Sequence, residues 1–152
     1  MQSTTSYTNA RGDAKRMRYV FIVLAILGII ASSLALREHY RTYGDAPCDI
    51  NEKWDCGIVN HSPYAMLGRI PVADIGIAGY LLLAILALKR SYLLLLAAAV
   101  PALGFSLYLA HIEASILGVW CVYCAISLGL ISLISLLSLG TLIAQALRRK
   151  SS

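Results

Sequence analysis

Residues 19–36 read YVFIVLAILGIIASSLAL, a stretch of 18 positions without a charged side chain. A helix rises about 1.5 Å per residue, so roughly 20 residues cross the ~30 Å hydrocarbon core of a bilayer. Three further apolar segments follow, at residues 72–88, 92–110 and about 116–147. The sequence therefore predicts an all-α integral membrane protein, built as a bundle of four transmembrane helices.

Composition supports this class. Of the 152 residues, 59% are hydrophobic and only 14% are charged, whereas soluble domains carry about 25% charged residues. The formal net charge is +5, but the basic residues form short clusters at the ends of the apolar segments. That distribution is typical of membrane topology signals and not of a phosphate-binding surface, so we expect no nucleic-acid partner.

The positions of the basic residues predict an orientation. Nine of them lie before the first segment, between the second and third, or after the fourth: Arg11, Lys15, Arg16, Arg18, Lys89, Arg90, Arg148, Arg149 and Lys150. The positive-inside rule then places both termini in the cytoplasm. We expect a cytoplasmic tail at residues 1–17 with residues 1–10 disordered, a transmembrane domain at 18–148, a long extracytoplasmic loop at 37–71 and a short cytoplasmic tail at 149–152. A cleaved signal peptide ending near Ala35 is the alternative for the first segment.

This topology brings all four cysteines to the extracytoplasmic side. Cys48 and Cys56 lie in the long loop, and Cys121 and Cys124 lie at the outer end of the last segment. Outside the cytoplasm, thiol pairs form and keep disulfides. A static disulfide is a fair alternative for the loop pair. It is a poor one for Cys121 and Cys124, because a bridge across so few residues removes little unfolded-state entropy.

A C-x-x-C pair at a helix start is better interpreted as a redox dithiol, since the helix dipole stabilises the thiolate. Cys124 should lie about 4.5 Å deeper in the membrane than Cys121. We expect a mobile, water-exposed loop pair to pass electrons to Cys121, and Cys124 to pass them to a lipid-soluble acceptor, a quinone. The C-x7-C spacing disfavours zinc, and no nucleotide fingerprint is present, so neither a metal nor a nucleotide is predicted.

Several short motifs together resemble the vitamin K epoxide reductase family, in the form of its bacterial homologues. They cover about residues 15–147: Cys48-Asp49-Ile50-Asn51, Asp55-Cys56, Ser62-Pro63-Tyr64-Ala65, Gly76-x-x-Gly79-Tyr80 and Trp120-Cys121-x-x-Cys124. The resemblance implies a four-helix bundle around a pocket for ubiquinone or menaquinone. It also implies a location in a bacterial inner membrane, where the enzyme reoxidises a separate thioredoxin-fold (DsbA-like) thiol oxidase and so supports disulfide-bond formation.

The resemblance also assigns roles to individual residues. Cys121 and Cys124 match the active-site pair, with Cys124 next to the quinone, and Cys48 and Cys56 match the shuttle cysteines. Ser62 matches a serine of the short loop helix that caps the pocket.

Two alternatives stay open. The animal enzymes have a tyrosine four residues after the second C-x-x-C cysteine, where this chain has Leu128, which disfavours vitamin K epoxide as the substrate. Reduction of a quinone or of that epoxide as the main role is the alternative enzymatic reading. A non-catalytic membrane scaffold with a disulfide-stapled loop is the alternative from another class.

The remaining candidates are polar residues near the predicted outer surface. Asn60, Ser62 and Trp120 are candidates for quinone binding, although Asn60 and Ser62 could instead satisfy loop backbone, and Trp120 could be an interfacial anchor like Trp54. Asp74 and Glu113 are candidates for supplying protons, since acids within a membrane are costly and often functional. Solvation at the interface is the alternative for both acids, and for His111, a weaker candidate for the same role.

Overall fold

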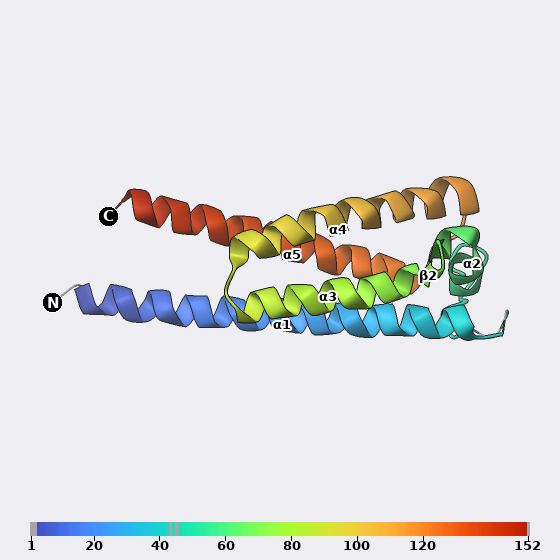
Figure 1. Ribbon diagram of the computed structural model, residues 1–152, viewed down its shortest axis with the longest axis horizontal. Coiled ribbons are helices and arrows are strands. Elements are labelled where there is room, and N and C mark those ends of the chain that lie inside the picture. The colour runs from blue at the N-terminus through green and yellow to red at the C-terminus, as the bar shows by residue number, and fades with distance from the viewer. Residues whose placement is uncertain (1–2, 43, 45, 152) are drawn as a thin grey trace.

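The computed structural model describes residues 3–42, 44 and 46–151, with side chains described from residue 12 onward. The elements in chain order are α1 (Ser3–Tyr40), α2 (Cys56–His61), η1 (Pro63–Ala65), β1 (Met66–Leu67), β2 (Ile70–Pro71), α3 (Val72–Leu88), α4 (Tyr92–Ile112), η2 (Glu113–Leu117) and α5 (Val122–Lys150). The long helices α1, α3, α4 and α5 run side by side, with both termini at one end and α2 at the other (Figure 1).

Three helical stretches of the described chain are long and apolar enough to cross a membrane: Gly12–Tyr40, Tyr92–Leu117 and Val122–Lys150. The helix α3 is also apolar and has 17 residues. Large apolar side chains on the outside of the bundle, such as Leu27, Leu93 and Leu136, are exposed. An outer surface of this kind suits lipid and not water, so the chain is a helical membrane protein.

Small residues let the helices approach closely. A Cβ atom on Gly28 of α1 would come within 2.3 Å of the Tyr80 ring of α3, and one on Gly76 within 2.7 Å of the Ser32 hydroxyl. Close approach of this kind replaces the hydrophobic driving force that is missing in lipid. The Tyr80 hydroxyl then reaches Ser127 of α5, whose carbonyl oxygen accepts its hydrogen bond at 2.8 Å. These contacts hold α1, α3 and α5 together.

The structure differs from two boundaries expected from the sequence. Residues 3–10 are helical, although a disordered tail is expected there, because extension of a helix that already exists adds one hydrogen bond for each residue fixed. The last helix begins at Val122 and not near Ile116. Gly118 adopts a left-handed conformation with φ of 69°, which ends the preceding π-helical turn η2 and separates it from α5.

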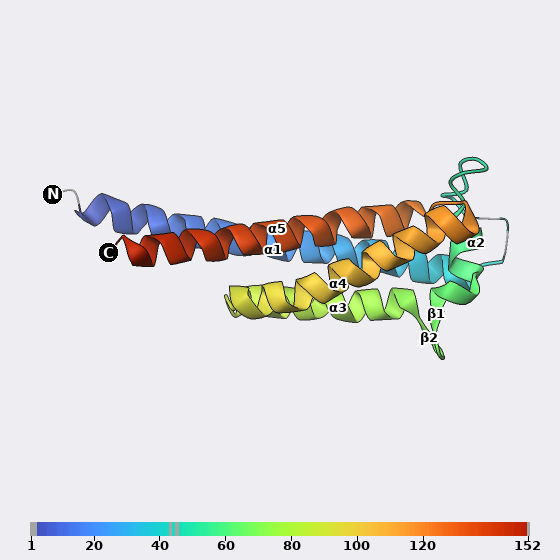
Figure 2. The ribbon, with the colours of Figure 1, turned by 90° about the horizontal axis from the view of Figure 1, so that it is seen from above.

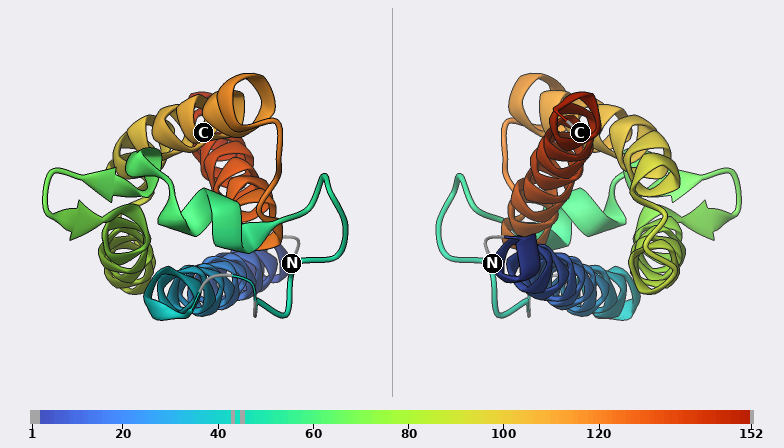
Figure 3. Two further views of the ribbon diagram at one scale, coloured as in Figure 1. Left: turned by 90° about the vertical axis from the view of Figure 1, so that its right-hand side faces the viewer. Right: turned by 90° about the vertical axis from the view of Figure 1, so that its left-hand side faces the viewer.

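The end of the bundle that holds the four cysteines is here called the cysteine end. The short helix α2 lies across this end, over the space between the long helices (Figure 3). The Asp55 side chain begins α2 by accepting a hydrogen bond from the Ile58 N–H at 2.8 Å. The β1–β2 hairpin follows α2 and projects to one side of the bundle, near the start of α3 (Figure 2).

The segment before α2 is tied to the segment before α5. The Trp120 N–H donates to the Lys53 carbonyl at 2.7 Å, and the Asp55 N–H donates to the Trp120 carbonyl at 3.1 Å. The Trp54 and Trp120 rings lie 6.4 Å apart, centroid to centroid. The two tryptophans therefore pack against each other and position the loop cysteines beside Cys121.

Candidate redox site

The loop cysteines form a disulfide between Cys48 and Cys56, with Cα atoms 5.8 Å apart. Cys56 is the first residue of α2, so the cap at Asp55 also fixes the position of the disulfide. The Asp49 carboxylate supports the same turn by accepting a hydrogen bond from the Gly57 N–H at 3.2 Å.

The C-x-x-C pair lies at the start of α5. Cys121 is the N-cap residue of this helix and Cys124 lies in its first turn, and both are free thiols. Cys121 packs in one buried cluster with Cys48 and Cys56, which Val59 and Val119 complete, and Cys124 lies at its edge. The structure thus brings together the four cysteines that the sequence predicts as a redox relay.

The burial of the loop pair corrects one expectation. The sequence predicts that the loop cysteines lie in water, yet Cys48 is only 6% exposed and Cys56 is fully buried. The reason is that α2 lies across the bundle end and presents Val59 to the same cluster. Both loop cysteines are therefore shielded from solvent while α2 is in this position.

Glu113 connects the two cysteines of the C-x-x-C pair. It is 3% exposed and lies at the start of η2, a π-helical turn of the kind that often occurs at functional sites. Its Oε2 atom accepts a hydrogen bond from the Cys121 N–H at 3.0 Å, and its side chain also hydrogen-bonds the Cys124 thiol. A buried carboxyl group therefore contacts both halves of the motif.

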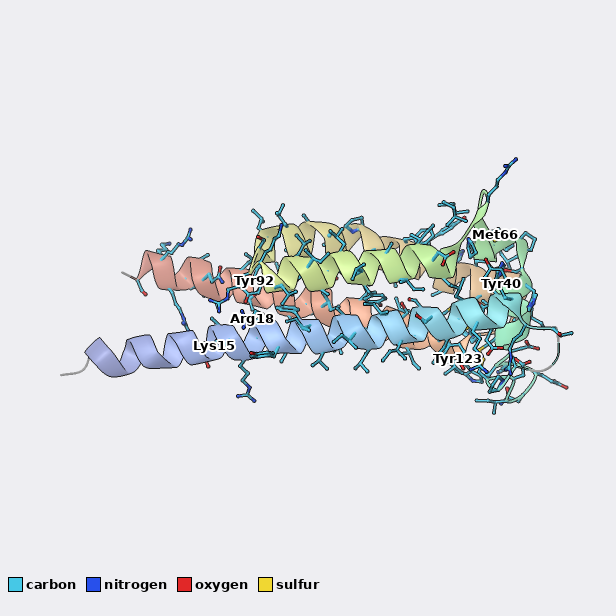
Figure 4. All side chains as sticks on the ribbon, turned by 60° about the horizontal axis from the view of Figure 1, so that its bottom comes forward. Lys15, Arg18, Tyr40, Met66, Tyr92 and Tyr123 are labelled. Carbon is cyan, nitrogen blue, oxygen red and sulfur yellow. A yellow bond between two sulfur atoms is a disulfide. The ribbon has the colours of Figure 1, made fainter. Side chains whose placement is uncertain are left out.

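A cavity of about 210 Å³ opens next to Cys124, enclosed by α1, α3, α4 and α5 and covered by α2. Its wall is mostly apolar and includes small residues such as Ala31, Ala35 and Gly79. The polar side chains of its wall gather mainly at the cysteine end: His39, Asn60, Ser62, Glu113, Trp120 and Tyr123. Figure 4 shows Tyr123 at this end, with Tyr40 and Met66, whereas Lys15, Arg18 and Tyr92 lie in the other half of the bundle.

The cavity brings together most of the predicted cofactor-binding residues. Asn60, Ser62, Glu113, Trp120 and Cys124 all line it. Asp74 does not; it is half-buried in the first turn of α3.

Two other polar candidates have local partners. The Ser62 hydroxyl donates to the Val59 carbonyl at 2.7 Å, so its proton already satisfies loop backbone. His111 is exposed, lies outside the cavity wall and contacts Ser115.

His39 lies in the last turn of α1 and lines the cavity, which the sequence does not predict. Its Nδ1 atom is hydrogen-bonded to the backbone carbonyl of Asn60. Because a carbonyl only accepts, Nδ1 carries the hydrogen of this bond. The neighbouring Glu38 is 2% exposed and pairs with Arg41 at 3.6 Å. Residues 38 and 39 follow an apolar segment directly, and the sequence alone assigns them to the loop.

The electrostatics of the pair distinguish the two thiols. The pKa of Cys121 is lowered, chiefly by a hydrogen bond from the Cys124 thiol, while burial acts in the opposite direction. A thiol with a lowered pKa is both a ready thiolate and a good leaving group in disulfide exchange. Cys121 is therefore suited to exchange with the adjacent loop disulfide.

Fold and site together define a class: a helical membrane protein with a dithiol and a disulfide in contact, beside an apolar cavity. Among the residues that the structure describes, no three or more metal-binding side chains gather at one place. The model of the vitamin K epoxide reductase family matches residues 19–139, well over half of the chain. The chain belongs to the vitamin K epoxide reductase family and is a membrane oxidoreductase. No curated protein matches it in sequence.

Proposed function

We propose that the protein is a thiol:quinone oxidoreductase that accepts electrons at Cys48 and Cys56 and delivers them from Cys124 to a membrane quinone, ubiquinone or menaquinone. One observation carries the proposal. Of the four cysteines, all of which the structure describes, Cys124 alone lines the cavity, while Cys121 lies in the cluster with the loop disulfide. Electrons that enter through the loop would therefore reach the cavity in the order Cys121, then Cys124.

The cavity suits a quinone. Members of this family use quinone-type substrates in general. A flat apolar ring and its isoprenoid tail match the apolar wall, and the polar rim could bind the ring oxygens. The reaction balances without another reagent: two thiols lose two electrons and two protons to become a disulfide, and the quinone gains them to become a hydroquinone.

Glu113 is placed to move one of these protons. Its carboxyl group contacts the Cys124 thiol and lines the cavity, so it can accept the thiol proton and pass it to a quinone oxygen. Asp74 stays a candidate for proton exchange at the membrane surface.

The physiological electron donor is proposed to be a thioredoxin-fold (DsbA-like) thiol oxidase outside the cytoplasm of a bacterium. The basic residues Lys15 and Arg18 lie in the half of the bundle away from the cysteines, as the positive-inside rule requires for an extracytoplasmic site (Figure 4). In this proposal α3 is the fourth membrane span, since its 17 residues reach the lower limit for crossing a bilayer.

Reduction of a soluble quinone analogue by a dithiol peptide, with purified protein in detergent, tests the proposal. We expect quinone consumption that requires each of the four cysteines, and Ser115→Ala serves as a control because Ser115 is exposed and lies outside the cavity wall. Turnover by Cys124→Ala at the wild-type rate would exclude the proposed route. Absence of any turnover, with a Cys48–Cys56 disulfide that resists mild reductant, would instead favour a static scaffold.

A further inference from the structure

The side chain of Asn60 contacts a sulfur atom of the redox site. Asn60 lies in α2 and is 6% exposed. Its Nδ2 atom lies 2.9 Å from the Cys56 carbonyl oxygen and 3.6 Å from the Cys121 sulfur. Because the Cys56 carbonyl can only accept, the amide group must present its nitrogen here, which fixes its orientation.

These two contacts leave the amide nitrogen without a hydrogen for a ligand. An asparagine amide carries two N–H hydrogens, and the Cys56 carbonyl and the Cys121 sulfur take one each. Asn60 lines the cavity, but it has no N–H left to donate to a quinone oxygen. The main polar contact of this side chain with a reacting atom is therefore with sulfur.

We propose that Asn60 is a catalytic residue of the thiol–disulfide exchange. Its side-chain N–H stabilises the Cys121 sulfur whenever Cys121 becomes a thiolate. This inference rests on the proposed function, because it assigns the residue to the internal transfer step. A hydrogen bond to a charged acceptor is about twice as strong as one between neutral groups, so the N–H contact favours the thiolate over the thiol.

The thiolate arises at a defined step. One loop thiolate attacks Cys121 of the Cys121–Cys124 disulfide, a new S–S bond forms, and Cys124 leaves with the electron pair. The second loop thiolate then attacks the loop sulfur of this mixed disulfide, and Cys121 leaves as a thiolate. The loop is now a disulfide and the C-x-x-C pair has gained two electrons, which is the redox state of the structure. Lower pKa of the leaving thiol makes the second step faster.

The position of Asn60 links stabilisation of the Cys121 thiolate to the docking of α2. The residue belongs to the helix that begins with Cys56, and its backbone carbonyl accepts a hydrogen bond from His39 of α1. When α2 moves away to expose the loop disulfide to a partner, the N–H leaves Cys121 as well. The Cys121 thiolate is then stabilised only while the loop cysteines are in place to exchange with it.

An ultraviolet titration of the thiolate tests the contact directly. In a variant with Cys48, Cys56 and Cys124 all changed to Ala, Cys121 is the single thiol. Adding Asn60→Ala should raise the Cys121 pKa by about one unit, a tenfold change in its ionisation constant. Asn60→Asp, which has no N–H to donate, should raise it further. Asn51→Ala, which removes another loop amide, should leave it unchanged. An equal pKa with and without Asn60 would overturn the proposal.

Kinetics of the otherwise wild-type protein separate this role from quinone binding. Asn60→Ala should slow reduction of the C-x-x-C pair by the loop about tenfold and leave the KM for quinone unchanged. A raised KM with an unchanged exchange rate would overturn the proposal and identify Asn60 as a quinone ligand. The titration needs no quinone turnover. It therefore tests the contact of Asn60 with Cys121 even if the protein does not have the proposed oxidoreductase activity.

Discussion

At the scale of single residues, the two thiols of the C-x-x-C motif contact different groups. Cys121 receives hydrogen bonds from Cys124 and Asn60, whereas Cys124 faces the cavity beside Glu113. Two cysteines that are three positions apart thus have separate environments, one for sulfur exchange and one for electron delivery.

Glu113→Gln tests the proton step. The amide keeps an oxygen for the Cys121 N–H but cannot carry a proton from Cys124 to a quinone. We expect quinone reduction to slow about a hundredfold, in the range of general acid–base effects. Steady-state rates with a dithiol peptide measure this. Glu52→Gln, a change at an exposed loop acid, is the matched control, and equal rates for both variants would remove Glu113 from the mechanism.

The lowered pKa of Cys121 predicts a pH dependence. Because the pKa lies below the ordinary value, the thiolate persists at pH values where a normal thiol, with a pKa of about 8.5, is protonated. The exchange rate of the reduced protein with a small disulfide should therefore reach its midpoint below that range. Cys124→Ala removes the main stabilising hydrogen bond and should move the midpoint to higher pH. The same pH midpoint in the wild type and in Cys124→Ala would contradict the conclusion that the Cys124 hydrogen bond lowers the Cys121 pKa.

At the scale of elements, the decisive feature is that the short helix α2 carries one loop cysteine and covers the cavity. It has six residues and cannot be stable alone, so the Asp55 cap and the strand-like contact between Trp54 and Trp120 must hold it in place. The Cys48–Cys56 disulfide and the contact of His39 with the Asn60 carbonyl also hold α2. Because α2 is separate from the long helices, its movement would not require them to unfold.

Asp55→Ala should loosen this element. Loss of an N-cap costs about 1 kcal/mol, and Cys56, the first residue of α2, is fully buried in the docked position of this helix. A small dithiol should therefore reduce the loop disulfide several-fold faster in this variant, as followed by thiol labelling. Asp55→Asn keeps an oxygen acceptor for the Ile58 N–H and should behave like the wild type. Equal reduction rates for all three proteins would show that the cap does not control access.

At the scale of the whole molecule, small residues serve both the packing of the bundle and the cavity. Gly28 and Gly76 let α1 and α3 approach, whereas Gly79 lines the cavity and a Cβ atom there would meet nothing within 4 Å. The helix α3 is therefore tightly packed against α1 on one side and open to the cavity on another.

Gly79→Leu should fill the cavity without straining the backbone. We expect kcat/KM for quinone to fall at least tenfold, mainly through KM, because the added side chain occupies the space proposed for the ring. Gly104→Leu is the matched control: it also has open space, but it is exposed and does not line the cavity. A similar loss in both variants would point to a general effect on α3 and α4.

The helices and the gathering of the cysteines could be predicted from the sequence, because apolar segments and the order of charged clusters depend on local composition. The contacts around Cys121 could not, since Asn60 and Glu113 come from two other elements and Asn60 lies far from Cys121 in the chain. The packing of Trp54 on Trp120 and the burial of Cys48 likewise depend on how the loop folds back on the bundle, which no local pattern encodes.

The central claim, that electrons pass from the loop pair to Cys121, is tested most directly by mapping disulfides in the Cys124→Ala variant after mild oxidation. Without Cys124, the Cys121 thiolate can attack the Cys48–Cys56 disulfide, so that a bond forms between Cys121 and one loop sulfur while the other loop cysteine leaves as a thiolate. We predict a peptide that links Cys121 to Cys48 or Cys56 by mass spectrometry. Recovery of only the Cys48–Cys56 disulfide, with Cys121 as a free thiol, would contradict the relay.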